Sequence, residues 1–178
     1  MLSNVLAMNT SDKITLGTDW LVLKTPKTVH TGQLVFADHG GEMAERIDLD
    51  TLQEKDSLNK DLGIEYVELE AGRVVMSMPV DARHHQPLGY LHGGASVVLA
   101  ESVATVGAWL NCPPGKVAFG SEINASHLRP MRSGILTGIG TPVQIGRKEQ
   151  VWEVHIQDED EKPVCVSRCR LAVVDAEQ

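Results

Sequence analysis

The chain has 178 residues, a formal net charge of −8, 42% hydrophobic residues and 22% charged residues. This length suits a single domain with a sizeable core, and the negative charge argues against broad binding to nucleic acid or to an anionic membrane. No apolar run approaches the ~20 residues that a membrane-spanning helix needs, and we expect no secretory leader. The three cysteines form no CxxC pair, so we expect a reducing, cytoplasmic environment.

The first part of the chain lacks a clear hydrophobic period. Residues 1–41 mix short apolar pieces with polar spacers. We therefore assign residues 1–45 to an N-terminal extension of undetermined order and residues 46–178 to the folded domain. A short amphipathic helix is predicted over residues 50–62, which carry Leu52, Leu58 and Leu62.

From Gly63 onward the pattern predicts two strands, one long helix and four more strands. The helix is predicted over residues 93–110, a proline-free run dominated by Ala, Val and Leu that ends at a turn with two prolines. Strands are predicted over residues 64–69, 73–80, 117–128, 135–144, 150–157 and 164–174. Consecutive strands joined by short turns form an antiparallel sheet, and a helix that is apolar on nearly every face is buried. We therefore predict an α+β fold in which an antiparallel sheet wraps around a long central helix.

One charged side chain interrupts the predicted helix. Glu101 is the only Asp, Glu, Lys, Arg or His between His92 and Lys116. Carboxylates are seldom placed in apolar surroundings without a reason, because they lose hydration there. Thr105 lies one turn later on the same face, within reach of the carboxylate or of a water beside it. A catalytic Glu101 is one interpretation; an exposed stripe or a structural ion pair is the other.

A second cluster lies where this helix begins. Gly93 and Gly94 follow His92, and a helix N-terminus offers free N–H groups and a positive dipole end. Without a Cβ, Gly93 allows a carbonyl oxygen to approach its N–H, as in an oxyanion hole. The alternative is a plain glycine entry to the helix, with His92 as its N-terminal cap.

The spacing of the two clusters has a consequence for assembly. Gly93 and Glu101 are eight residues apart, roughly 12 Å along one helix axis at about 1.5 Å per residue. A general base or nucleophile and an oxyanion donor must both reach one carbonyl group. We therefore expect a two-fold dimer in which Gly93 of one chain faces Glu101 of the other.

The run from Gln86 to Ser102 resembles the hotdog-fold thioesterases of the phenylacetate-pathway and 4-hydroxybenzoyl-CoA type. Residues 122–129 and 150–154 extend this resemblance, which is strongest to the branch of 1,4-dihydroxy-2-naphthoyl-CoA and enterobactin-proofreading thioesterases and spans about residues 52–175. It implies a hotdog fold, dimers or dimer-of-dimers tetramers, and hydrolysis of an acyl- or aroyl-CoA without metal or cofactor. A carrier-protein thioester is a further possible substrate.

The resemblance also implies roles for single residues. Glu101 is the nucleophile or the base that activates water, and the Gly93 N–H polarises the thioester carbonyl. Gln86 helps to bind that oxygen or to position water, His92 orients the site, and Thr105 holds the water or the carboxylate. Residues implied to bind CoA are His127, Arg129, Gly146, Arg147 and Lys148.

Other functions are less well supported by the sequence. It has no GxGxxG, no GxxxxGK[ST], no GxSxG elbow and no zincin spacing among its histidines. Two alternatives stay open: a non-catalytic acyl-CoA-binding hotdog protein, and a hydratase or dehydratase of acyl thioesters.

Overall fold

A computed structural model describes residues 55–176. It contains a short helix α2 (Leu58–Asp61), strands β1 (Glu65–Glu70) and β2 (Arg73–Val80), a 3₁₀ turn η1 (Ala82–His84), the long helix α3 (Gly93–Leu110), and strands β3 (Lys116–His127), β4 (Gly134–Ile145), β5 (Glu149–Gln157) and β6 (Pro163–Asp175). The predicted bounds of β2 and α3 are confirmed, and the other strands differ from their predicted bounds by one residue at one or both ends.

The predicted helix over residues 50–62 is shorter within the described residues. There α2 has four residues, with Ser57 as its N-cap. Gly63 ends this segment with a φ of 64°, a conformation that glycine adopts without strain. Residues 50–54 and the expected domain boundary after residue 45 lie outside the described residues.

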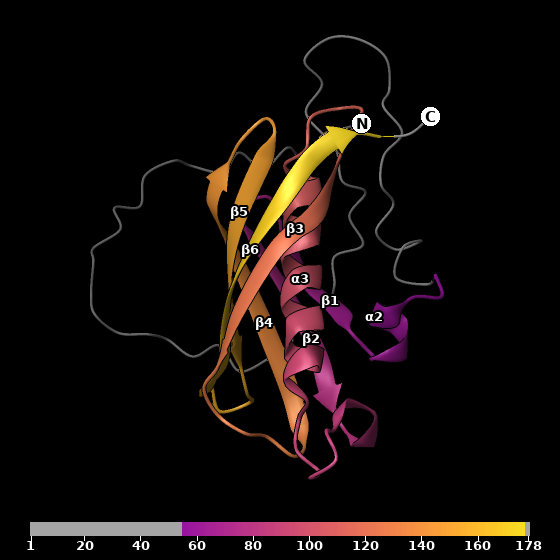
Figure 1. The fold of residues 1–178 in the computed structure, drawn as a ribbon, viewed down its shortest axis with the longest axis vertical. Coiled ribbons are helices and arrows are strands. Elements are labelled where there is room, and N and C mark those ends of the chain that lie inside the picture. Colours follow the sequence, from indigo (N-terminus) through magenta and orange to yellow (C-terminus); the bar gives the residue numbers. More distant parts are fainter. Residues whose placement is uncertain (1–54, 177–178) are drawn as a thin grey trace, which may run out of the picture.

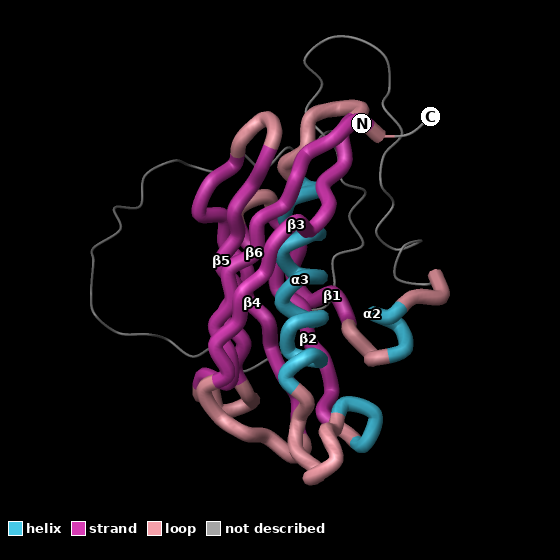
Figure 2. Tube along the Cα trace, in the orientation of Figure 1, coloured by secondary structure: helices cyan, strands magenta, loops and turns pink. Residues whose placement is uncertain are grey.

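The six strands form one antiparallel sheet in the order β1-β2-β4-β5-β6-β3. Helix α3 runs along one face of this sheet, and η1 and the loop between β3 and β4 lie near the end where α3 begins (Figures 1 and 2). Strand β3 lies at one edge of the sheet, with β6 as its neighbour, although β4 and β5 separate the two in chain order. This arrangement confirms the predicted sheet around a central helix.

Small residues allow α3 to lie close to the sheet. A Cβ on Gly107 of the helix would stand 2.5 Å from the ring of Trp152, and a Cβ on Gly140 of β4 would stand 2.5 Å from Val103. Trp152 is fully buried, and its indole N–H donates to Gln150 Oε1 at 3.1 Å. Gln150 Nε2 in turn donates to the carbonyl of Ala108 at 3.1 Å, so this buried chain of hydrogen bonds ties the C-terminal turn of α3 to β5.

Helix α3 is long and apolar enough to cross a membrane by length and composition alone. Its apolar character has another explanation, because most of its residues pack in the core against the sheet.

The expectation that α3 is buried on nearly every face needs one correction. A stripe that contains Val97, Val98, Glu101 and Thr105 is only half-buried in the single chain. Because Val97 and Val98 lie beside the carboxylate on this stripe, it resembles the surface of a contact more than a solvated face.

Candidate active site

The N-terminus of α3 is capped by His92, which leaves one amide free. The imidazole Nδ1 of His92 accepts the Gly94 N–H at 2.8 Å, and the His92 carbonyl accepts the Ala95 N–H at 2.9 Å. The interpretation of His92 as a capping residue is therefore correct. The Gly93 N–H finds no acceptor among residues 55–176, and it stands at the positive end of the helix dipole. Its chemistry suits a carbonyl oxygen that gains negative charge.

His127 lies directly against Gly93. A Cβ on Gly93 would stand 2.6 Å from His127 Nε2 and 3.0 Å from its Cε1. Only glycine therefore fits at the first helical position while the imidazole stays in place. The family resemblance implied that His127 binds CoA, and this stays a prediction. The structure places His127 at the start of α3, beside Gly93, the proposed oxyanion donor.

Glu101 extends from the half-buried stripe of α3 over the edge strand. Its Oε1 occupies the space that a Cβ on Gly120 of β3 would take. Its charge also reaches Cys169, the pKa of which is raised to about 12 by burial and by Glu101. Within residues 55–176 the carboxylate has no hydrogen bond and no ion pair, so the interpretation as a structural ion pair finds no support in the described chain. Such a carboxylate is available to a substrate.

Thr105 shares the half-buried stripe with Glu101, as predicted, but no hydrogen bond joins the two among the described residues. The neighbouring Ser102 is already engaged, because its hydroxyl donates to Asn59 Oδ1 of the α2 segment at 2.7 Å. Thr105 is thus the hydroxyl on this stripe that remains available beside Glu101.

Gln86 lies in the loop before α3, and backbone bonds hold that loop in a fixed shape. The Gln86 N–H donates to the Tyr90 carbonyl at 2.8 Å, and its Oε1 accepts the Leu88 N–H at 2.5 Å. The Leu91 N–H donates to the Met131 carbonyl at 2.7 Å, which joins this loop to the one after β3. The Gln86 amide Nε2 has no partner in the described chain and is available as a donor.

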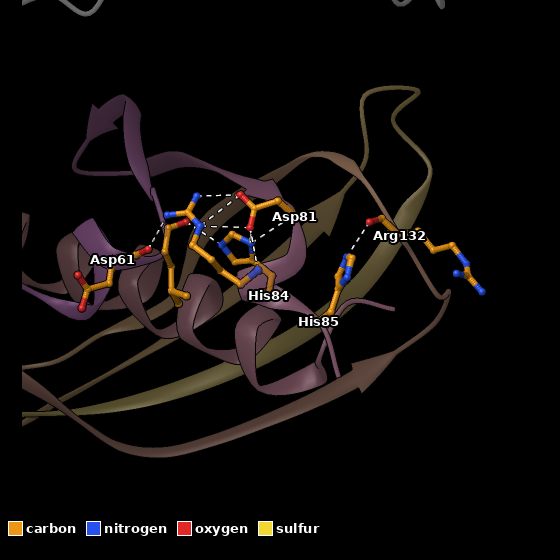
Figure 3. Close-up of polar contacts among 7 residues, drawn as sticks. Asp61, Asp81, His84, His85 and Arg132 are labelled. Atoms are coloured by element: carbon orange, nitrogen blue, oxygen red, sulfur yellow. Dashed lines mark hydrogen bonds and ion pairs between the residues drawn. The ribbon is translucent and has the colours of Figure 1, made fainter. Parts of the chain in front are cut away.

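A buried histidine, His84, anchors the same loop (Figure 3). Its Nδ1 accepts the Asp81 N–H at 3.2 Å, its Nε2 lies 2.9 Å from the Leu62 carbonyl, and its own carbonyl accepts the His92 N–H at 2.7 Å. The Asp81 Oδ1 atom also lies 3.1 Å from Nδ1, so both ring nitrogens of His84 have polar neighbours. His84 was not among the residues singled out from the sequence. The signal was Asp81 three residues before it, the spacing of a capping box.

Arg129 does not present a free guanidinium. Its Nη2 bonds to Asp158 Oδ2 at 2.6 Å and to the Lys162 carbonyl at 3.3 Å. It lines a groove of about 400 Å³ whose rim includes Tyr90 with the guanidinium of Arg132 stacked on its ring at 3.9 Å. His85 steadies this rim by its bond from Nε2 to the Arg132 carbonyl at 2.7 Å (Figure 3).

The remaining residues expected to bind CoA lie at the opposite end of α3. Gly146 forms the β4–β5 turn, where its N–H donates to the Glu149 carbonyl at 3.0 Å. The exposed Arg147 and Lys148 belong to this turn, which adjoins the C-terminal turn of the helix through Gln150. One protomer therefore does not bring Arg147 and Lys148 together with His127 and Gly93.

Comparison with known proteins adds an independent line of evidence. A family model described as the thioesterase superfamily matches residues 88–165. The chain is 47% identical over 116 residues to a 1,4-dihydroxy-2-naphthoyl-CoA hydrolase of Listeria monocytogenes, which covers 65% of this chain and 94% of the relative. It is 46% identical over 113 residues to the proofreading thioesterase EntH of Klebsiella pneumoniae, which covers 64% of this chain and 82% of the relative.

A solved structure from Staphylococcus aureus, a variant with one glutamate replaced by alanine, superposes with a TM-score of 0.66 at 30% identity. It covers 67% of this chain and all of that one. The same protein, a thioesterase, was also solved with a glutamine replaced by alanine, and this structure has a TM-score of 0.63 at 31% identity.

Proposed function

The chain belongs to the thioesterase superfamily and is a thioester hydrolase with the hotdog fold, and we propose that each of its active sites combines Gly93 of one protomer with Glu101 of a two-fold partner. The observation that carries the proposal is the pair of contacts along β3. Gly93 lies against His127 at the end of this strand, and Glu101 lies over Gly120 nearer its start.

Strand β3 supports the assembly. It has twelve residues, borders the sheet and pairs with β6 along its length, so within residues 55–176 its other edge pairs with no strand. Such an edge is a template for pairing with another strand. Antiparallel pairing of β3 with its copy, about a two-fold axis midway between Gly120 and His127, places each His127 beside the partner's Gly120. Gly93 then faces the partner's Glu101, and the half-buried stripe of α3 meets its own copy.

Each proposed residue then has a task in thioester hydrolysis. The Gly93 N–H and the Gln86 amide donate to the carbonyl oxygen, which becomes an oxyanion as the tetrahedral intermediate forms. The partner's Glu101 attacks the carbonyl carbon or removes a proton from the attacking water, and Thr105 beside it holds that water or the carboxylate. Collapse of the intermediate breaks the C–S bond, and the leaving thiolate takes a proton from water or from the protonated Glu101, so CoA leaves as the thiol. In the direct route the acyl group stays on Glu101 as a mixed anhydride, which water then hydrolyses. Both routes end in the free acid and need no cofactor.

A feature of the Staphylococcus aureus thioesterase supports two of these roles. The glutamine and the glutamate replaced in its two variant structures are fifteen residues apart, and so are Gln86 and Glu101. The same pair of residue types at the same spacing favours a shared site.

The two-fold arrangement also supports the proposed binding of CoA. In an antiparallel pair of helices, the C-terminal end of one lies near the N-terminal end of the other. The partner's Arg147 and Lys148 therefore approach the N-terminal end of α3, beside which His127 at the end of β3 and Arg129 in the following loop lie. Arginine and lysine on exposed turns suit the phosphates of CoA. Arg129 binds a phosphate of CoA only if that phosphate displaces the Asp158 carboxylate from its guanidinium.

The acyl group is proposed from the relatives. One of them is a hydrolase of 1,4-dihydroxy-2-naphthoyl-CoA, so we propose an aromatic acyl group. The other is a proofreading thioesterase, so a carrier-protein thioester is a second substrate to test. We place the enzyme in the cytoplasm, because its three cysteines are free and buried.

The decisive experiment is thiol release from a panel of benzoyl-, 4-hydroxybenzoyl-, 1,4-dihydroxy-2-naphthoyl- and hexanoyl-CoA. We expect turnover that is fastest with an aromatic member, and a loss of about three decades in kcat for Glu101→Ala. Glu65→Ala, which removes an exposed carboxylate of β1 at the opposite edge of the sheet, is the matched control and stays near the wild-type rate. Binding without thiol release would favour a non-catalytic acyl-CoA protein, and an unsaturated thioester as product would favour a hydratase or dehydratase.

A further inference from the structure

At Gly120 the edge strand β3 has no side chain, and the Glu101 side chain occupies the space that one would fill. Gly120 pairs with Leu171 of β6, and its helix-facing side is the side on which Glu101 lies. A Cβ built there overlaps Glu101 Oε1 and stands 3.3 Å from Cδ and 3.6 Å from Cγ of the same side chain. The terminal half of Glu101 therefore rests in the space that any other residue at position 120 would fill.

A β-bulge in β3 next to Gly120 keeps this space free of other side chains. The pairing register of β3 with β6 shifts between Gly120 and Glu122, which makes Ser121 the extra residue of a β-bulge. The Ser121 hydroxyl donates to the Arg170 carbonyl at 3.1 Å and fixes the bulge to β6. Because of the bulge, the helix-facing position after Gly120 is Ile123 rather than Glu122. Ile123 packs on the core, so Gly120 is the gap in an otherwise filled row.

We propose that Gly120 is a positioning residue whose missing side chain fixes the location of the Glu101 carboxylate at the sheet edge. The inference rests on the proposed catalytic role of Glu101. It explains why the carboxylate can reach the edge of β3, which is the side from which a partner's Gly93 and the thioester approach. Gly120 does not touch the substrate in this proposal; it acts only through Glu101.

The structure separates this role from a packing role. An added methyl at Gly107 meets the rigid ring of Trp152, whereas an added methyl at Gly120 meets the far end of a flexible side chain. Glu101 can rotate away with little cost to the fold. We therefore expect Gly120→Ala to displace the carboxylate without unfolding the protein. A misplacement of about 1 Å lowers the rate roughly 100-fold.

The test uses the full chain and the panel member that the wild type hydrolyses fastest. Gly120→Ala is compared with Gly72→Ala, a turn glycine with an ordinary φ whose Cβ would meet nothing within 4 Å. We expect Gly120→Ala to lower kcat about 100-fold, with KM, the Kd of the matching non-hydrolysable thioether and the melting temperature close to wild type. Gly72→Ala stays within about twofold in kcat.

A double-variant cycle identifies the partner through which Gly120 acts. In the Glu101→Ala background the clash is absent, so Gly120→Ala should leave the residual rate unchanged. An unchanged kcat in Gly120→Ala alone overturns the inference, and so does an equal loss in both backgrounds. Full activity of Glu101→Ala itself defeats the proposed function separately, whatever Gly120→Ala does.

Discussion

The shared active site makes a quantitative prediction about mixed dimers. Gly93→Pro removes the proposed oxyanion donor, and its ring also displaces the His127 imidazole of the same chain, so it disables this half of the site by both effects. Proline itself is compatible with the first position of a helix. His92 already has the extended backbone that precedes proline, with ψ at 129°. Glu101→Ala removes the proposed nucleophile or base. Each variant alone should form inactive dimers, because both sites of each dimer lack one of the two groups.

The expected activity follows from the two-fold geometry. Random association of equal amounts of the two variants yields about half mixed dimers. In a mixed dimer, one site receives both defects and the other receives none, provided that Gly93 and Glu101 of a site come from different chains. The mixture should therefore recover about one quarter of the wild-type rate. If both residues came from the same chain, every site would be defective and the mixture would stay inactive.

The assay is thiol release after the two variants, with different tags, are unfolded and refolded together. The tags report the share of mixed dimers, so a low rate cannot be attributed to failed exchange. A second mixture pairs wild type with the double variant, and it should retain about one quarter of the rate for a shared site but about one half for separate sites. An inactive first mixture together with one half in the second would refute the shared site.

Three further predictions concern stability. Gly107→Ala should lower the free energy of unfolding by up to about 2 kcal/mol in urea titrations, because overpacking against Trp152 outweighs the gain in helix propensity. His84→Phe should lower it by about 2–4 kcal/mol, since the fully buried imidazole serves two backbone partners that phenylalanine cannot replace; a loss below about 1 kcal/mol would contradict the network. The third prediction concerns pH. Burial and the charge of Glu101 raise the pKa of the Cys169 thiol from its ordinary 9.0 to about 12, so stability should fall as pH rises through this interval, and Cys169→Ala should flatten the fall.

Local signals account for most of what the sequence predicted correctly. The bounds of α3 follow from residues that start and stop helices, namely the glycines after His92 and the prolines after Asn111. The strand bounds follow from turn residues and alternation. Glu101, Gly93 and His92 are site candidates because a lone charge in an apolar helix and a glycine-rich helix start are visible in the chain itself; their catalytic roles stay predictions.

Long-range placement was not accessible from the same signals. No local pattern indicates that β3 passes the other strands and borders the sheet beside β6. The contacts of His127 with Gly93 and of Gly120 with Glu101 follow from that placement. The engagement of Arg129 by Asp158 was also beyond reach, because a basic residue on a turn looks the same in sequence whether it is paired or free.

The position of β3 has a consequence for the order in which the protein takes shape during synthesis. β3 leaves the ribosome well before β6, the strand that holds it in the sheet. Until Leu171 is made, Gly120 has no cross-strand neighbour, and the part of the sheet against which Glu101 lies has not formed. In the interval a nascent β3 exposes both of its edges, which is when such segments associate wrongly. The surroundings of Glu101 are therefore complete only after β6 is made, and a pause in translation between residues 127 and 171 should prolong the exposure of both edges of β3.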